Sequence, residues 1–516
     1  MALTRRQLLQ CAALTGGVAA TMRVAAALEL MPGGTLPPPL QLSKARGQRH
    51  VLILGAGIAG LVSAFELQRA GYSVQVLESA NRLGGRVLTV RGGDVIDEIG
   101  NRQVCQFDND PNLYFNAGAS RIPTVHSQIL AYCKQLGVTL EPHINSNYAA
   151  WLQFDGFQDG KRMRQREFIA DARGFISELA GRSLSAATLD APLSEADRDR
   201  LRAFITQFGD LDKSLHYTGS PGRAGRLHGG GLFDHDGNKT PLTAAQLLSS
   251  DYWRTAMMFG EDEYQSAVLQ PVGGMDMIIR GFAAQLPGRI ELNSQVIAIR
   301  TSDRKVEVTY RKDGTTHTVS GDYCLDSVPG QLLAGVDSNF SAGMKKLLTV
   351  RPRGTLSKIA LQMRERFWER EGVYGGISWT NRDIGQIQYP SHGFGQRKGV
   401  LIGGYYLAAG PATRFTTMSA EERIAAALAQ GEGLHPGYAK YFENGCSVAW
   451  HRMNHMLGCT ARETDEETLK MLRQPEGRHY LVGDQISAHA GWMEAAVLAA
   501  QNVLNRVEER EAAGAA

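Results

Sequence analysis

The chain has 516 residues, of which 43% are hydrophobic and 21% are charged, a composition typical of a globular protein with two or three domains. Its 55 basic and 52 acidic residues nearly balance and form no dense basic tract, so the charge pattern gives no indication of a nucleic-acid partner. No internal apolar run approaches the length that spans a bilayer, and we expect no stable membrane span.

The first 30 residues differ in character from the rest of the chain. Arg5 and Arg6 lie in the segment TRRQLL and precede a mildly apolar stretch that Arg23 interrupts. This pattern resembles a twin-arginine export signal, and the alternative is a helical or disordered extension. Residues 31–48, rich in proline and glycine, indicate a linker. Since twin-arginine export carries folded proteins, we expect a periplasmic or secreted bacterial protein.

The segment from His50 to Val87 predicts a mononucleotide-binding unit. An apolar strand is expected over residues 50–54, a helix over 59–70 and a second strand over 73–77. Gly55 permits a tight turn, Gly57 lets backbone approach a pyrophosphate at the helix N-terminus, and Gly60 permits close helix–strand packing. Glu78 ends the second strand, where a carboxylate accepts hydrogen bonds from ribose hydroxyls. This order predicts a Rossmann-like dinucleotide site.

Two further segments resemble the flavin-containing amine oxidase superfamily. Residues 82–86, RLGGR, follow the acid directly and match the family's R-x-G-G-R extension. Near the C-terminus, residues 479–507 contain a strand, a Gly-Asp pair ending at Asp484, a loop and a helix, as in the family. The resemblance runs from about residue 48 to the C-terminus and is closest to FAD-dependent L-amino acid oxidases. It implies that FAD is bound by both ends of the chain.

The resemblance implies an α/β fold with a Rossmann-like domain, an interleaved mixed-sheet substrate domain and a helical domain. The expected borders are a signal at 1–30, a linker at 31–48, FAD-binding parts at 49–115, 266–349 and 446–510, substrate parts at 116–160 and 350–445, and a helical domain at 161–265. Residues 165–211 are expected to be mostly helical, with a capping pattern at Ser194. A strand is expected over 289–299, and Asp313-Gly314 predicts a hairpin turn.

The resemblance also implies which residues hold the cofactor. In the family, the second Arg of the extension approaches the pyrophosphate, a strand valine contributes to the adenine site, and the acid of the Gly-Asp pair contacts the pyrophosphate–ribityl region. The matching set in this chain is Gly55, Gly57, Ala59, Gly60, Glu78, Arg86, Gly118, Ala119, Arg121, Val296, Asp484, Trp492 and Met493. We expect the FAD to be bound noncovalently.

Substrate residues follow from the same resemblance. Arg121, in the segment NAGASRIP, matches an arginine that binds the substrate's α-carboxylate, a role that suits the planar fork of a guanidinium. Tyr389, in QYPSH, is expected to bond the same carboxylate, and Lys358 matches the lysine that holds a water against the flavin. The alternatives are a structural ion pair for Arg121, a core aromatic for Tyr389 and a surface lysine for Lys358.

Trp450 and Trp492 resemble the aromatic walls of the family's active site, and core packing is their alternative. Ala490 stands where the snake-venom enzymes have histidine, so substrate preference stays open. His451 and His455 have HxxxH spacing without a third ligand, and we expect no metal site. Apart from Cys11 in the expected signal, five scattered cysteines are expected to be mostly buried thiols.

These residues predict oxidative deamination of an L-amino acid, with molecular oxygen as the second substrate and 2-oxo acid, ammonia and hydrogen peroxide as products. An amine or polyamine oxidase and a flavin-dependent amino acid 2-monooxygenase remain alternatives in the same superfamily. A flavin-binding module without turnover is the alternative from another class. A homodimer is expected only by analogy with the family.

Overall fold

The computed structural model describes residues 40, 42–45, 47–183, 194–224, 239–250, 252–253, 263, 267–407, 414–415 and 417–513. The expected export signal at 1–30 lies outside these residues, as do parts of the expected linker and of the expected helical domain. Among the described helices, none combines the length and the apolar composition that crossing a membrane requires.

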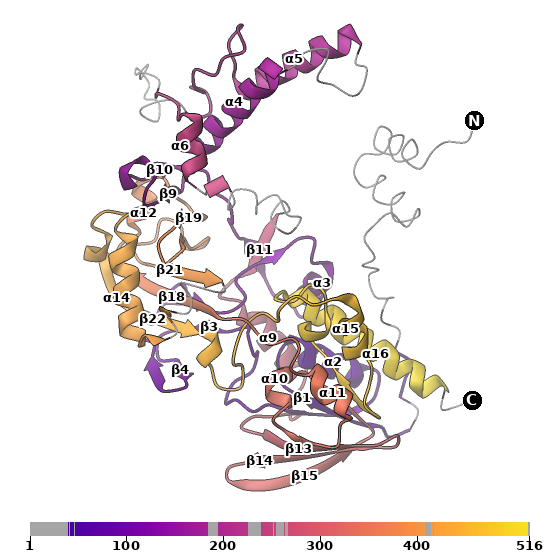
Figure 1. The fold of residues 1–516 in the computed structure, drawn as a ribbon. Helices are drawn as coiled ribbons and strands as arrows, with labels where there is room; N and C mark the ends of the chain where they lie inside the picture. The colour runs from indigo at the N-terminus through magenta and orange to yellow at the C-terminus, as the bar shows by residue number, and fades with distance from the viewer. Residues whose placement is uncertain are drawn as a thin grey trace.

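A five-stranded parallel sheet is built from distant parts of the chain (Figure 1). Its order is β12 (Ile290–Glu291), β2 (Ser73–Leu77), β1 (His50–Leu54), β16 (Tyr323–Asp326) and β23 (His479–Leu481). Both ends of the chain therefore contribute strands to one sheet. The strands β1 and β2 have the predicted bounds, and α2 (Ile58–Arg69) begins and ends one residue before the predicted helix.

Helices cover the parallel sheet and bury its apolar strands. Strand β1 is buried from Val51 to Leu54, and α2 buries ten of its twelve residues against it, as expected for a strand and helix in the centre of an α/β layer structure. The C-terminal helix α16 (Met493–Ala513) packs against α2 and against α3 (Ser127–Gln135). The two ends of the chain thus share one hydrophobic core.

Residues 289–299 form two strands of different sheets, so the prediction of a single strand is wrong. Strand β12 joins the parallel sheet, whereas β13 (Gln295–Thr301) joins the four-stranded sheet β15-β14-β13-β17. Asn293 between them has a φ of 56°, a left-handed conformation that breaks an extended strand. The predicted hairpin is confirmed: Asp313 and Gly314, both with positive φ, connect β14 (Val306–Lys312) to β15 (Thr315–Gly321).

A seven-stranded mixed sheet forms the second body of the molecule, with α14 (Ala420–Gly431) packed against it (Figure 1). Its order is β10 (Met163–Arg164), β9 (Trp151–Gln153), β19 (Ile377–Thr380), β20 (Gln386–Gln388), β21 (Gly399–Leu407), β18 (Leu356–Met363) and β22 (Phe442–Ala449). Residues 163–164 and 446–449 belong to this sheet, although the sequence borders assigned them to neighbouring domains.

A pair of helices projects from this second sheet (Figure 1). They are α4 (Gln165–Ser183) and α5 (Glu195–Gly209), and α6 (Ala244–Ser249) packs against α4. The predicted cap is confirmed, because the Ser194 side chain accepts a hydrogen bond from the backbone N–H of Asp197. A hydroxyl in this position satisfies one of the free N–H groups at the start of a helix.

Candidate functional site

A cavity of about 700 Å³ lies at the carboxyl ends of the parallel strands. Gly55 follows β1, Glu78 follows β2, Ser327 follows β16 and Gly483 lies just after β23, and all four line the cavity. Ligands of open α/β sheets bind at this edge, and the volume is in the range of small-molecule and cofactor sites.

The glycine-rich turn after β1 brings backbone to the cavity. Gly55 has a φ of 92°, and a Cβ there would lie 2.4 Å from the hydroxyl oxygen of Ser327, so only glycine fits. Gly57 and Ala59 line the cavity at the start of α2, where free N–H groups favour an anion. Gly60 does not line it. A Cβ on Gly60 would lie 2.0 Å from the carbonyl oxygen of Gly55, which agrees with the predicted packing role.

Glu78 ties the first two strands together at the cavity. One carboxylate oxygen accepts a hydrogen bond from the backbone N–H of Ala56 at 2.7 Å, and the other accepts from Ala80 at 2.8 Å. Each carboxylate oxygen has a second lone pair, so the side chain can still accept hydrogen bonds from ribose hydroxyls. Val296 lines the same cavity.

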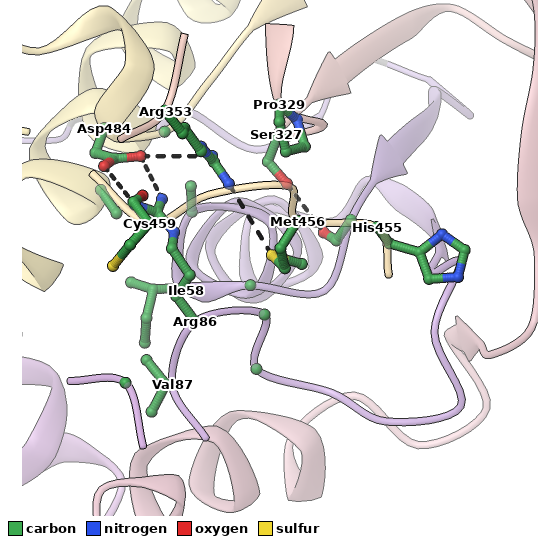
Figure 2. A pocket seen from close by; sticks show the side chains of 18 of the residues that line it. Ile58, Arg86, Val87, Ser327, Pro329, Arg353, His455, Met456, Cys459 and Asp484 are labelled. Carbon is green, nitrogen blue, oxygen red and sulfur yellow. Dashed lines mark hydrogen bonds and ion pairs between the residues drawn. The ribbon is translucent and has the colours of Figure 1, made fainter. Parts of the chain in front are cut away.

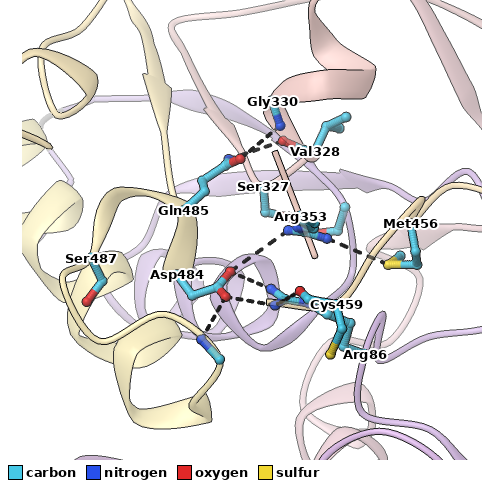
Figure 3. Close-up of polar contacts among 12 residues, drawn as sticks. Arg86, Ser327, Val328, Gly330, Arg353, Met456, Cys459, Asp484, Gln485 and Ser487 are labelled. Atoms are coloured by element: carbon cyan, nitrogen blue, oxygen red, sulfur yellow. Dashed lines mark hydrogen bonds and ion pairs between the residues drawn. The ribbon is translucent and has the colours of Figure 1, made fainter. Parts of the chain in front are cut away.

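A buried charge cluster joins the N-terminal and C-terminal motifs (Figures 2 and 3). Arg86 forms a bidentate pair with Asp484, and one of its two bonds measures 2.7 Å. Arg353, which the sequence analysis missed, lies 3.8 Å from the same carboxylate. Although burial raises the pKa of Asp484, the two guanidinium groups lower it well below its usual range. The cluster therefore carries a net positive charge in the cavity wall, which suits a pyrophosphate.

Lys358 lies on β18 and is 1% exposed, with its side chain at the cavity. Its ammonium donates to the carbonyl oxygens of Gly118 at 2.6 Å and Asn116 at 3.2 Å and to the hydroxyl of Ser120. An ammonium has three N–H donors, so these three bonds use them all. Burial, reinforced by the charge of Arg121, lowers the pKa of Lys358 to about 7. The lysine thus holds the loop that carries Gly118, Ala119 and Arg121.

The far end of the cavity is cationic and aromatic. Arg121, Tyr405 and Trp492 line it together with Lys358 and Met493. The Trp492 ring contacts the edge of His126 at a centroid distance of 4.9 Å. Burial lowers the pKa of His126 to about 4, so this imidazole is neutral near pH 7 and adds no charge to the far end of the cavity.

Tyr405 was missed by the sequence analysis. It lies on β21 directly opposite Lys358 on β18, and the lysine nitrogen is 4.7 Å from the centroid of its ring. Only the register between the two strands shows that they are neighbours.

The prediction that the Tyr389 hydroxyl binds the substrate is wrong. Tyr389 is 3% exposed, and its hydroxyl bonds Ser378 at 2.6 Å and His435 at 2.5 Å inside the core of the second sheet. Trp450 does not line the cavity either, so the predicted wall is incorrect. It is fully buried and donates its indole N–H to the carbonyl of Ala117 at 2.9 Å, which supports the loop from beneath.

Other sequence expectations concerned metals and thiols. Within the described part of the chain, no group of three or more His, Cys, Asp or Glu side chains could hold a metal ion. His451 lies in the short 3₁₀ turn Trp450–Arg452 and His455 has a φ of 65°, so the pair does not share a helix face. Cys459 lines the cavity and is only partly buried, whereas the other described cysteines, Cys105, Cys133, Cys324 and Cys446, are buried.

The residues around the cavity fit FAD. The glycine turn, the helix N-terminus and the Arg86–Arg353–Asp484 cluster suit a pyrophosphate. Glu78 suits a ribose, and the apolar surface around Val296, Leu333 and Val336 suits an adenine ring. The same cavity continues to Lys358 and Trp492, where a flavin ring and a substrate would meet.

Comparisons with known proteins agree with this geometry. The family model described as flavin containing amine oxidoreductase matches residues 58–507. The flavin-dependent L-tryptophan oxidase of Lentzea aerocolonigenes is 27% identical over 491 residues, covering 90% of this chain and 98% of that protein. An L-amino-acid oxidase of Siganus canaliculatus is 27% identical and covers 89% of this chain and 85% of its own length.

Solved structures share the fold at low sequence identity. Cyclohexylamine oxidase from Brevibacterium oxydans has a TM-score of 0.60 at 18% identity and covers 90% of this chain and 99% of its own. A variant of putrescine oxidase has a TM-score of 0.59 at 19% identity, with the same coverage. At this identity the structural matches show the fold alone.

Proposed function

Since the chain belongs to the flavin-containing amine oxidoreductases and binds FAD, we propose that it is an L-amino acid oxidase, which converts an L-amino acid and oxygen to a 2-oxo acid, ammonia and hydrogen peroxide. The observation that carries this proposal is the position of Arg121, whose side chain lines the cofactor cavity beside Lys358. An oxidase of simple amines has no carboxylate for this arginine to bind. The two relatives named for L-amino acid substrates, each 27% identical, support the same choice.

Bound FAD supplies the acceptor for a hydride and returns the electrons to oxygen. The chain's own contribution is to hold and orient both molecules. Arg86 and Arg353 offer guanidinium groups to the pyrophosphate, and Asp484 holds both arginines in place. Because Asp484 stays ionised inside the protein, this cluster keeps its geometry across the neutral pH range.

Arg121 and Tyr405 are proposed to bind the substrate carboxylate. A guanidinium can give two parallel hydrogen bonds to a carboxylate, and a phenol can give a third. Trp492 and the neutral His126 would then border the substrate side chain and exclude water. This placement fixes the α-carbon relative to the cofactor, which is the main requirement for hydride transfer.

The cations of the pocket also act on the substrate amine. Oxidation requires the neutral amine, whereas a free amino acid carries an ammonium at neutral pH. Arg121 and Lys358 both lie in the pocket, and like charges nearby disfavour a further positive charge. The site therefore favours loss of the amine proton while the carboxylate stays bound.

The test is a hydrogen peroxide assay of the purified holoenzyme with each of the twenty L-amino acids and with the corresponding decarboxylated amines. We expect peroxide with one or more L-amino acids and a lower kcat/KM for each matched amine. A preference for the amine would refute the proposal in favour of an amine oxidase. Release of an amide in place of a 2-oxo acid would identify a 2-monooxygenase.

We further propose that the protein is exported after folding and acts in the periplasm or outside the cell. The support is the Arg5-Arg6 segment and the apolar stretch that follows it. Loading FAD before export suits a cofactor that is enclosed by both ends of the chain. A homodimer is proposed by analogy with the family alone, and light scattering of the purified holoenzyme tests it.

A further inference from the structure

A second, smaller cavity of about 50 Å³ lies behind the loop that carries Arg121. Ser120 lines both this cavity and the main one, and the polar side chains of His143, His392 and Gln388 line its other walls. A cavity needs roughly 10–15 Å³ and two to four polar partners to hold a water. The small cavity meets both requirements.

The two histidines of the small cavity differ in what their ring nitrogens do. His392 has its Nε2 at 3.0 Å from the carbonyl oxygen of Asn112, so Nε2 must carry the hydrogen. Its Nδ1 then accepts from the hydroxyl of Tyr114 at 3.2 Å. Both nitrogens of His392 are therefore engaged.

His143 presents an acceptor. The amide nitrogen of Gln270 donates to the carboxylate of Glu141 at 2.8 Å, which fixes the orientation of this amide because a carboxylate only accepts. The amide oxygen of Gln270 consequently faces the Nδ1 of His143 at 2.7 Å. Nδ1 must carry the hydrogen, and Nε2 is left as an unprotonated acceptor.

Ser120 presents a donor. Its hydroxyl oxygen accepts a hydrogen bond from the ammonium of Lys358. Among the residues that the structure describes, the hydroxyl hydrogen has as acceptors the carbonyl oxygens of Gly118 at 3.3 Å and Asn116 at 3.5 Å. Both distances exceed the usual range for a hydroxyl donor, so the hydrogen is better placed toward a water in the cavity.

We propose that a water in the small cavity completes a hydrogen-bonded chain from Lys358 to Glu141, and that His143 is a positioning residue which stabilises the ammonium form of Lys358. Along this chain, Lys358 donates to Ser120, and Ser120 donates to the water. The water donates to His143, which donates to Gln270, which donates to Glu141. Every donor points the same way, so the chain is polarised between a cation and an anion. The hydrogen-bonded chain itself does not depend on the proposed oxidase function, and only its effect on catalysis rests on that function.

The other groups around Lys358 leave its pKa in a range where the hydrogen-bonded chain can change its protonation. The pKa of Lys358 is lowered to about 7, and burial is the largest cause. The charge of Arg121 contributes to this lowering, and Cys459 opposes it. The ring of Tyr405 faces the ammonium at 4.7 Å and favours the charged form. Because these effects leave Lys358 close to half protonated near neutral pH, a small change in the chain changes its protonation measurably.

The same charges, with His392, act on His143. Burial lowers the pKa of His143 to about 4, and Arg121, Lys358 and His392 lower it as well, against the hydrogen bond that His143 donates to Gln270. His143 therefore stays neutral above pH 5 and can serve as an acceptor throughout the neutral range.

The test compares two substitutions of His143 in the holoenzyme. His143→Asn keeps an N–H near the position of Nδ1 but removes the acceptor that faces the cavity, whereas His143→Gln places an amide near the position of Nε2. The measurement is the pH titration of the resting flavin's absorption spectrum, with Lys358→Met identifying the transition that belongs to the lysine. We expect His143→Asn to lower its midpoint by about half a pH unit to one unit. His143→Gln should restore most of the shift.

His392→Gln is the matched control, because it changes a histidine of the same cavity that is not a member of the chain and contacts it only at 3.5 Å, through the amide nitrogen of Gln270. Its midpoint should equal that of the parent, and melting temperatures should show that all variants are folded. Nitrogen-15 spectra of histidine-labelled protein give a second measure, in which His143 should be neutral with its hydrogen on Nδ1. An unchanged midpoint in His143→Asn, or the opposite tautomer, would overturn the proposal. Neither measurement uses a substrate, so a failed amino acid oxidase assay leaves both outcomes readable.

Discussion

Replacing Arg121 with alanine separates an amino acid oxidase from an amine oxidase. If Arg121 pairs with the substrate carboxylate, its loss leaves that charge in a cavity from which water is largely excluded. Removing one partner of such a buried pair costs about 2–5 kcal/mol. At about 1.4 kcal/mol per tenfold change, kcat/KM for L-amino acids should fall about 30-fold to a few thousandfold.

The structure sets the rest of this prediction. Arg121 lines the cavity, so we expect Arg121→Ala to affect substrate binding more than the melting temperature. The charge of Arg121 lowers the pKa of Lys358, and its removal should therefore raise that pKa above 7. Arg121→Lys is the matched control, since it keeps the charge and loses the planar fork, and its loss of kcat/KM should be smaller.

The assay is steady-state peroxide release with an L-amino acid and with the amine that lacks its carboxylate. For the amine, Arg121→Ala should have the activity of the parent or a higher one, because no carboxylate is left unpaired. If Arg121→Ala oxidises the amino acid as well as the parent does, the carboxylate clamp is wrong. The amine oxidase alternative then takes its place.

Three further predictions follow from the same geometry. Tyr405→Phe should lower kcat/KM for L-amino acids by about tenfold or more, because a hydrogen bond to a charged group contributes about 1.5–3 kcal/mol. Tyr389→Phe should instead leave kcat/KM unchanged and lower the melting temperature. Equal losses of activity in the two variants would contradict this assignment. Lys358 has a folded pKa of about 7, below its ordinary value of 10.5, so the unfolded chain binds more protons between these values and this group's contribution to stability rises with pH there. Chemical denaturation should show that rise in the parent relative to Lys358→Met, and parallel pH profiles would refute it. Replacing Arg5 and Arg6 with lysine should retain folded, FAD-containing precursor in the cytoplasm, as cell fractionation would show, and unchanged localisation would refute the export signal.

Local geometry explains which parts of the fold could be predicted. The strand His50–Leu54, the turn at Gly55 and the strand Ser73–Leu77 have the predicted positions because each depends on residues next to it in sequence. The break at Asn293 was not predicted, since an asparagine in the left-handed region is permitted but not required by its neighbours. Similarly, β22 pairs with the distant strand β18, and β10 joins the same sheet through β9, whose other neighbour β19 is distant in sequence.

The two tyrosines show the same limit within the site. Tyr389 was chosen from the segment that it occupies, directly after β20, but its hydroxyl bonds Ser378 and His435 in the core. Tyr405 is brought to Lys358 because β21 pairs with β18 and the two residues are register partners. A motif identifies residue types in order along the chain, whereas strand order and register decide which side chains meet. A strand residue that binds a substrate carboxylate is thus less predictable from the sequence than a glycine in a turn.

The charges of the cavity bear on how one fold could hold a dianionic cofactor and, under the proposed function, an anionic substrate in the same space. Near the glycine turn, Arg86 and Arg353 share the single carboxylate of Asp484, so one positive charge remains for the pyrophosphate. At the far end, the ammonium of Lys358 bonds three neutral oxygens, so its charge is not cancelled by an acid through these bonds. Because burial makes an unneutralised cation costly, the charge near the glycine turn suits a bound anion, whereas Lys358 can also avoid this cost by releasing its proton, since its pKa lies at about 7. The uncompensated charge near the glycine turn therefore argues for the pyrophosphate, and under the proposed function a substrate carboxylate would favour the charged form of Lys358 at the far end.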